Sequence, residues 1–144
     1  MKHLIKTLAV ILLLNSCSGS ADNKAPELAN EMCGCFDSFQ NSMSADAKKL
    51  MKAVSVAAKP QEVLMSGMSD LKPDDAKAFA EQLKAIGDKN SSILKCMEAF
   101  DKKHGKETTA DKTALIEKLL MEMQKNGNCY VGAAIVNLNP RAKK

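Results

Sequence analysis

Cysteine constrains this chain more than any other residue type. Its 144 residues contain five cysteines, and an odd number leaves one without a disulfide partner inside the chain. Cys33 and Cys35 are separated only by Gly34, so on a helix their side chains would point about 200° apart. A bond between them would break that helix. We therefore expect each of these two cysteines to reach a different element.

The first sixteen residues have the pattern of a secretory signal peptide. Lys2, His3 and Lys6 make a short basic region, and the apolar run TLAVILLL follows at 7–14. That run is shorter than the roughly 20 residues that a membrane-spanning helix needs. Removal of 1–16 takes away Lys2 and Lys6, which reduces the formal charge of +4 by two. We therefore expect a nearly neutral mature chain.

Leu14-Asn15-Ser16-Cys17 ends this segment and resembles the lipobox of bacterial lipoproteins, although Asn15 departs from the small apolar residue usual there. The resemblance covers residues 1–17. It implies cleavage after Ser16, a diacylglycerol thioether on Cys17 and acylation of the new amino group. Three acyl chains exceed the two signals that stable anchoring requires. Ser18, in place of Asp, resembles lipoproteins passed on to the outer membrane, with its periplasmic and surface faces both left open.

Ordinary secretion is the alternative to lipidation. The small residues at 19–21 would serve as the cleavage site, and Cys17 would be lost with the discarded segment. After a lipidated Cys17, residues 17–26 are small and polar and are expected to form a flexible tether. Residues 27–140 are expected to form the domain, and 141–144 a basic, solubilising tail.

Four cysteines remain once Cys17 is assigned to lipid: Cys33, Cys35, Cys96 and Cys129. An even number suits disulfide bonding in an oxidising compartment, and four cysteines allow three pairings. Cys35 lies in the middle of an apolar stripe. We therefore favour Cys35–Cys96 with Cys33–Cys129 over the swapped arrangement. Each bond would close a long loop and contribute on the order of 4 kcal/mol in the loop-entropy model.

Apolar residues recur at helical spacing through the domain. The first stripe runs from Leu28 to Met43, and Ser44 is expected to cap a second helix that Pro60 ends. After a short apolar piece at 63–68, Pro73 opens the longest element.

That longest element is a heptad-like seam reaching residue 104, interrupted at its centre by Gly87. A fourth apolar face follows at 115–123, after a start resembling a capping box at Thr108. We interpret 129–138 as a short helix, since a lone strand would have no partner. The prediction is an all-α fold, a small bundle of about five helices stapled by two disulfides.

Cys33-Gly34-Cys35 has a second interpretation as a redox-active dithiol, because closely spaced cysteines form reducible disulfides. Against it, the pair lies inside a predicted helix with Cys35 on the core stripe. A site of four thiolates would suit zinc, but the periplasm favours oxidation. We favour structural disulfides.

Methionine is the second excess, with nine in the chain. Thioethers are soft ligands suited to Cu(I), and Met65-Ser66-Gly67-Met68 resembles the M-x-x-M spacing of periplasmic copper-handling segments. Most of the methionines nevertheless fall on apolar stripes, where they fill gaps in a core. We expect no metal and no cofactor, with Met65 and Met68 kept as a minor copper candidate.

Neither catalysis nor nucleic-acid binding has support in the sequence. His104 is the only histidine after the signal segment, and a charge at a helix end explains it. There is no G-x-S-x-G, no H-E-x-x-H and no Gly-rich phosphate loop. No long run of like charges is present either.

Taken whole, the chain resembles small helical envelope lipoproteins of Gram-negative bacteria that carry C-x-C shortly after the tether, a resemblance that implies no activity. We expect a non-enzymatic, lipid-anchored envelope protein with an interaction or structural role. Its partners would be the membrane and an unidentified envelope protein. The alternatives are a copper or thiol-redox protein using Met65/Met68 or Cys33/Cys35, and a carrier of small hydrophobic ligands.

Overall fold

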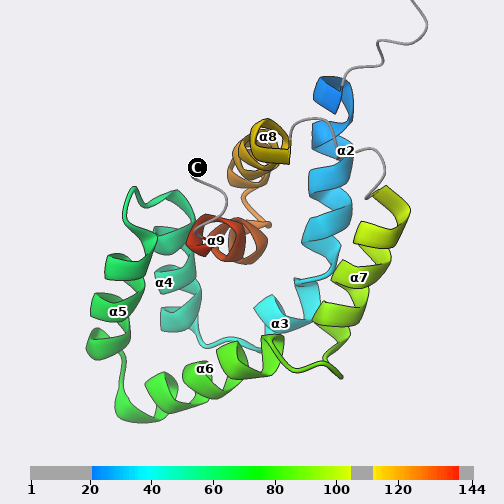
Figure 1. Ribbon diagram of the computed structural model, residues 1–144. Helices are drawn as coiled ribbons and strands as arrows, with labels where there is room; N and C mark the ends of the chain where they lie inside the picture. The colour runs from blue at the N-terminus through cyan, green and yellow to red at the C-terminus, as the bar shows by residue number, and fades with distance from the viewer. Residues whose placement is uncertain (1–20, 105–111, 140–144) are drawn as a thin grey trace, which may run out of the picture.

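The computed structural model describes residues 21–104 and 112–139, and its regular elements in these ranges are all helices. The all-α prediction is confirmed for this part of the chain. Figure 1 shows the helices in their spatial arrangement. They are α2 (Ala21–Gly34), α3 (Asp37–Ser42), α4 (Ala45–Val56), α5 (Pro60–Asp70), α6 (Pro73–Ile86), α7 (Ser92–His104), α8 (Lys112–Lys125) and α9 (Tyr130–Leu138).

The expected number of about five helices is too low, because turns divide two of the predicted elements and residues 60–70 form a helix of their own. The first division falls in the C-x-C segment. The Cys35 N–H donates to Met32 O at 3.2 Å and the Phe36 N–H donates to Cys33 O at 2.9 Å, which closes a tight turn between α2 and α3. The chain changes direction there, so that the two cysteines face different neighbours.

Ser91 makes the second division, between α6 and α7. Its hydroxyl donates to Ile86 O at the end of α6 (3.1 Å) and accepts from the Leu94 N–H at the start of α7 (3.0 Å). The Asp88 carboxylate accepts from the Asn90 N–H within the same turn. One side chain thus satisfies backbone groups of both helix ends, which is why the long apolar seam folds as two helices.

α2 begins earlier than the sequence predicts. It starts at Ala21 and contains Pro26, so residues 21–26, expected in the tether, are helical. Ala25 is buried, as are Leu28 and Ala29, which pack in one cluster with α8 residues. This burial stabilises a turn that composition alone would leave flexible. The lipobox, Cys17, Thr108 and the tail at 141–144 lie outside the described residues.

α9 lies at the centre of the molecule, where Figure 1 shows it almost end-on with the other helices around it. Its buried residues are Tyr130, Val131, Gly132, Ala133, Ala134 and Asn137. A short helix that is apolar on most sides is stable only when neighbours cover it. The interpretation of this segment as a helix is confirmed, and its β-branched residues pack against α4 and α8.

The core has two clusters of buried side chains. The larger one joins α3, α4, α6, α7 and α9 and includes Phe36, Met51, Val54 and Phe79. The smaller one joins α2, α8 and α9 and includes Leu28, Leu119 and Met123. Within the described residues, no helix has the length and apolar character needed to cross a membrane.

Candidate functional site

Two disulfides meet at the turn between α2 and α3, and we call Cys33, Cys35, Cys96 and Cys129 the disulfide junction. Cys33 bonds to Cys129 at the start of α9, with 5.3 Å between their Cα atoms and a sequence separation of 96. Cys35 bonds to Cys96 in α7, with a Cα–Cα distance of 5.6 Å and a separation of 61 residues. This is the pairing that the position of Cys35 on the apolar stripe favours.

The junction contradicts the interpretation of Cys33 and Cys35 as a redox-active dithiol with each other. Each sulfur is bonded to a distant helix, and the turn between them separates their directions. All four sulfurs are consumed, so the junction also offers no thiolate set for zinc. Both bonds close long loops, and the loop-entropy model assigns each about 4 kcal/mol of stability.

The two disulfides differ in exposure. Cys129 is 2% exposed and Cys33 is 8% exposed, so the Cys33–Cys129 bond lies inside the smaller cluster. Cys35 is 8% exposed, but Cys96 is only partly buried at the edge of the larger cluster. Of the two disulfides, Cys35–Cys96 therefore contains the more exposed cysteine.

A charged cluster joins α2 to α7 beside the junction, and we call Glu31, Lys103 and His104 the α2–α7 clamp. Lys103 Nζ lies 2.9 and 3.0 Å from the two Glu31 carboxylate oxygens. His104 Nε2 lies 2.9 Å from Glu31 Oε2. The hydrogen bond from Lys103, and then the one with His104, lowers the pKa of Glu31 below its ordinary value of 4.5.

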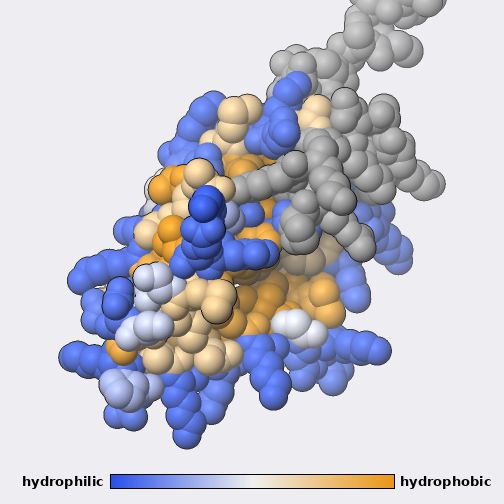
Figure 2. All heavy atoms as spheres, turned by 60° about the vertical axis from the view of Figure 1, so that its left-hand side comes forward, coloured by the Kyte–Doolittle hydropathy of each residue, from blue (hydrophilic) through white to orange (hydrophobic). Residues whose placement is uncertain are grey.

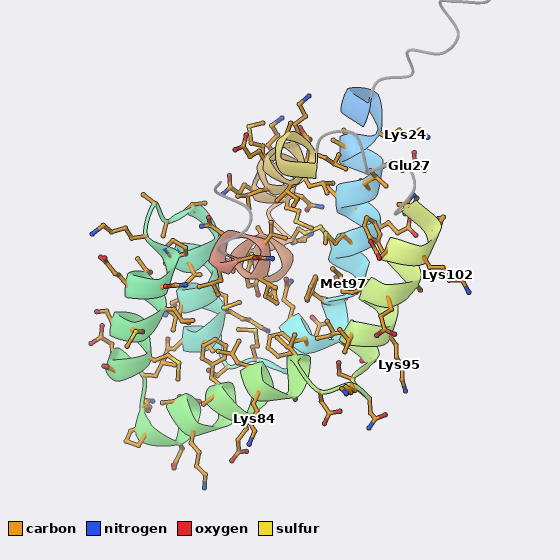
Figure 3. The ribbon with its side chains drawn as sticks, in the orientation of Figure 1. Lys24, Glu27, Lys84, Lys95, Met97 and Lys102 are labelled. Atoms are coloured by element: carbon orange, nitrogen blue, oxygen red, sulfur yellow. A yellow bond between two sulfur atoms is a disulfide. The ribbon has the colours of Figure 1, made fainter. Side chains whose placement is uncertain are left out.

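The clamp holds the histidine ring in a structural position. The His104 side chain is 13% exposed, and its ring centroid lies 4.9 Å from that of Phe100. Figure 3 shows the two sides of α7, with Met97 pointing inward and Lys95 and Lys102 pointing outward. The sequence predicted only a cationic helix end here, because more than 70 residues separate the partners and no local spacing indicates the contact.

Asn137 is a second residue whose role sequence reasoning missed. Its side chain is buried, and its Nδ2 donates to Val54 O and Ala57 O, both at 2.9 Å. These carbonyls lie at the end of α4, where the helix supplies few donors, and Val54 O also accepts from the Ala57 N–H at 3.3 Å. The one available signal was a lone amide in an otherwise apolar segment, which marks a buried polar group that must be hydrogen-bonded.

The M-x-x-M pair is split between solvent and core. Met65 is 75% exposed, whereas Met68 packs against the larger cluster. Only one of the two thioethers is therefore freely presented to a metal. Among the described residues, no group of three or more His, Cys, Asp or Glu side chains could hold a metal ion.

Apolar side chains reach the surface on the side that contains α5. Figure 2 turns this side forward and shows orange areas bordered by blue charged residues. Val56 at the end of α4 is 68% exposed, and Met65 in α5 is exposed as well. A nearby open hollow of about 350 Å³ is lined by Lys59, Pro60, Gln61, Glu62, Asn137, Leu138 and Asn139. Its exposed walls are more apolar than polar, and the hollow is open to solvent instead of enclosing a ligand.

Comparison of the chain with protein-family models, with curated proteins and with solved structures finds no match.

Proposed function

We propose that this chain is a non-enzymatic lipoprotein of the bacterial cell envelope, attached to the outer membrane through Cys17 and serving an interaction or structural role. The folded part is a disulfide-stapled helical domain that presents its surface to other envelope components. The proposal includes the membrane as one partner and an unidentified envelope protein as the other. It includes no nucleic acid and no cofactor.

One observation carries the proposal. The two disulfides account for every cysteine after residue 17, with Cys33 bonded to Cys129 and Cys35 bonded to Cys96. Cys17 is thereby left over, at the position where the lipobox resemblance requires a free thiol for the diacylglycerol. Disulfides that span the domain also suit an oxidising compartment.

The attachment of α2 supports an anchored module. Because α2 begins at Ala21, only residues 18–20 separate Cys17 from the folded helix. Three residues span at most about 10 Å when extended. The lipid would therefore hold the domain close to the headgroups. The disulfide junction at the other end of α2 connects that helix covalently to α7 and α9.

The side chains best suited to catalysis are already engaged. The His104 ring is held between Glu31 and Phe100, and four cysteines are oxidised. A general base or nucleophile must be free to reach a substrate. These contacts support a role in binding or envelope structure in preference to chemistry.

Cell fractionation tests the anchor. The Cys17→Ser variant, expressed in a Gram-negative host, should move from the membrane pellet to the soluble periplasmic fraction. Ser20→Ala is the matched control, because it lies beyond the lipobox and should remain in the pellet. Persistent membrane association of Cys17→Ser would contradict the lipid assignment. A separate experiment, affinity purification of the lipidated chain from its own envelope, would identify the protein partner.

The copper alternative rests on Met65 and Met68. A competition titration of Cu(I) against a chromophoric chelator should show no metal transfer to the wild-type chain. Transfer that is lost in Met65→Leu would favour the copper function over the proposal above.

A further inference from the structure

α6 and α7, residues 73–104, follow one another along the edge of the molecule and meet at a turn with a steep angle between them, each packing on other helices, α6 on α4 and α7 on α2 (Figure 1). We call this bent pair the α6–α7 hairpin. The structure describes both helices along their whole length. Each has one buried residue, Phe79 in α6 and Ile93 in α7. The central helices α4 and α9 bury several side chains each. Local stability follows buried apolar contact, so the hairpin is held less firmly by packing than the centre is.

The hairpin has few polar links to its neighbours. The α2–α7 clamp joins Glu31 to Lys103 and His104, and Gln82 Nε2 donates to Ser42 O at 3.1 Å. Lys103 is mostly exposed, and ion pairs of this kind contribute little to stability. The Cys35–Cys96 disulfide is the covalent link between the hairpin and the α2–α3 turn. It is therefore the main fastening of α7.

The Cys35–Cys96 disulfide is also the more exposed of the two disulfides. Cys96 is partly exposed, whereas both cysteines of the other disulfide are buried in the smaller cluster. Exchange begins when an external thiolate reaches a disulfide sulfur along its S–S axis, so access decides which bond reacts first.

We propose that Cys35–Cys96 is a thiol–disulfide exchange site, at which an external dithiol reductant unfastens the α6–α7 hairpin while Cys33–Cys129 stays intact. This inference concerns the folded domain and does not depend on lipid at Cys17.

The exchange balances in two steps. One thiol of the reductant loses its proton and attacks Cys96 Sγ; an S–S bond forms between the two, the Cys35–Cys96 bond breaks, and Cys35 leaves as a thiolate that takes up a proton. The second thiol of the reductant then attacks the reductant sulfur that is bonded to Cys96 Sγ. The mixed disulfide breaks, and Cys96 is released as a thiol. The protein disulfide gains two electrons and two protons, and the dithiol is oxidised to its disulfide.

Opening the bond would uncover apolar surface. Phe36 and Phe39 pack in the same core cluster as Phe79 and Ile93 of the hairpin. When α7 is no longer tied to the α2–α3 turn, these contacts open and close as a local unit. Cys33–Cys129 continues to hold α2 against α9. The reduced form therefore keeps its central helices and exposes an aromatic surface.

Partial reduction tests the inference directly. The full chain, solubilised in detergent, is exposed to limiting dithiothreitol, quenched with an alkylating agent and mapped by mass spectrometry. We expect Cys35 and Cys96 to be alkylated about tenfold faster than Cys33 and Cys129, since Cys96 is the most exposed residue of the four. Equal rates, or faster loss of Cys33–Cys129, would overturn the proposal.

Hydrogen exchange tests the conformational part. In the singly reduced chain, amide exchange should rise at least about tenfold across 73–104 and stay unchanged in α8 and α9. The Cys35→Ser/Cys96→Ser variant should show the same pattern without reductant, and Cys33→Ser/Cys129→Ser should not. A uniform rise over the whole chain, or complete unfolding of Cys35→Ser/Cys96→Ser by circular dichroism, would show that the hairpin is not a separable unit and would refute the proposal.

Discussion

Asn137 illustrates how one polar residue can organise an apolar interior. Its amide group joins the end of α9 to the carbonyls that end α4, and the residue is only 4% exposed. A buried amide is tolerated only when its hydrogen bonds are made, because an unsatisfied group keeps the whole penalty of leaving water. The side chain therefore stabilises this packing in one arrangement.

Asn137→Ala should destabilise the protein by about 1–3 kcal/mol, because it removes the amide donor to the Ala57 carbonyl and one of the two donors to the Val54 carbonyl. Urea unfolding followed by circular dichroism measures this loss. Asn41→Ala, at an exposed position in α3, is the matched control and should change the unfolding free energy by less than about 0.5 kcal/mol. Equal effects of the two substitutions would show that the buried amide has no special role.

Glu31 gives the protein a specific acid response. Its pKa is lowered in the folded state by Lys103 and His104, so its contribution to stability is present above the ordinary value of 4.5 and is lost as the pH falls through the lowered value. Glu31→Gln should therefore have a lower melting temperature than the wild type at pH 7, and the two should converge in strong acid. A melting-temperature gap that persists unchanged at low pH would contradict this assignment.

At the scale of elements, the same residue type serves different roles according to its helix. Met51 in α4 is completely buried, whereas Met65 in α5 is largely exposed. The flexible thioether fills an irregular interior in the first case and lies at the surface in the second. The contrast follows from position, since α4 packs against both α5 and α9.

Met51→Ala should lower the free energy of unfolding by about 2–5 kcal/mol, because it leaves a cavity in the larger core cluster. Met65→Ala should change the same quantity by no more than about 0.5 kcal/mol. Chemical denaturation of the two variants side by side checks the contrast. A strongly destabilised Met65→Ala would indicate that the α5 surface is covered in the native protein.

Helix identities were predictable where pattern and local signals agree. Ser44 caps α4 as its side-chain chemistry predicts, accepting from the Ala47 N–H at 3.3 Å. Pro73 begins α6 as predicted. Pro60 was expected only to end the second helix, and it instead begins α5. The predicted start of α2 was wrong, because this helix is stabilised by buried side chains such as Leu28, which packs in one cluster with α8 residues, and local propensity does not report such tertiary contacts.

The candidate site was predictable only in its covalent part. The position of Cys35 on an apolar stripe favoured the observed pairing, Cys35–Cys96 with Cys33–Cys129. The α2–α7 clamp and the Asn137 bridge depend on which helices become neighbours, over separations of more than 70 residues. Such contacts have no local sequence signature, so they follow from the tertiary arrangement.

At the scale of the whole molecule, the two disulfides should divide stability unequally. Cys33–Cys129 closes the longer loop and connects α2 to the central helix, whereas Cys35–Cys96 fastens an edge. The Cys33→Ser/Cys129→Ser variant should lose on the order of 4 kcal/mol or more and unfold globally at a lower urea concentration. The Cys35→Ser/Cys96→Ser variant should lose less and show a separate early transition. The reverse order would contradict the central position of α9.

The central claim is that the chain is a lipoprotein whose remaining cysteines staple its domain. The most direct measurement is the mass of its N-terminal tryptic peptide after purification from the membranes of a Gram-negative host. Our account predicts a peptide of residues 17–24 with a diacylglycerol on Cys17 and a third acyl chain on its amino group. A peptide that begins after residue 17, carries no lipid and comes from the soluble fraction would contradict it.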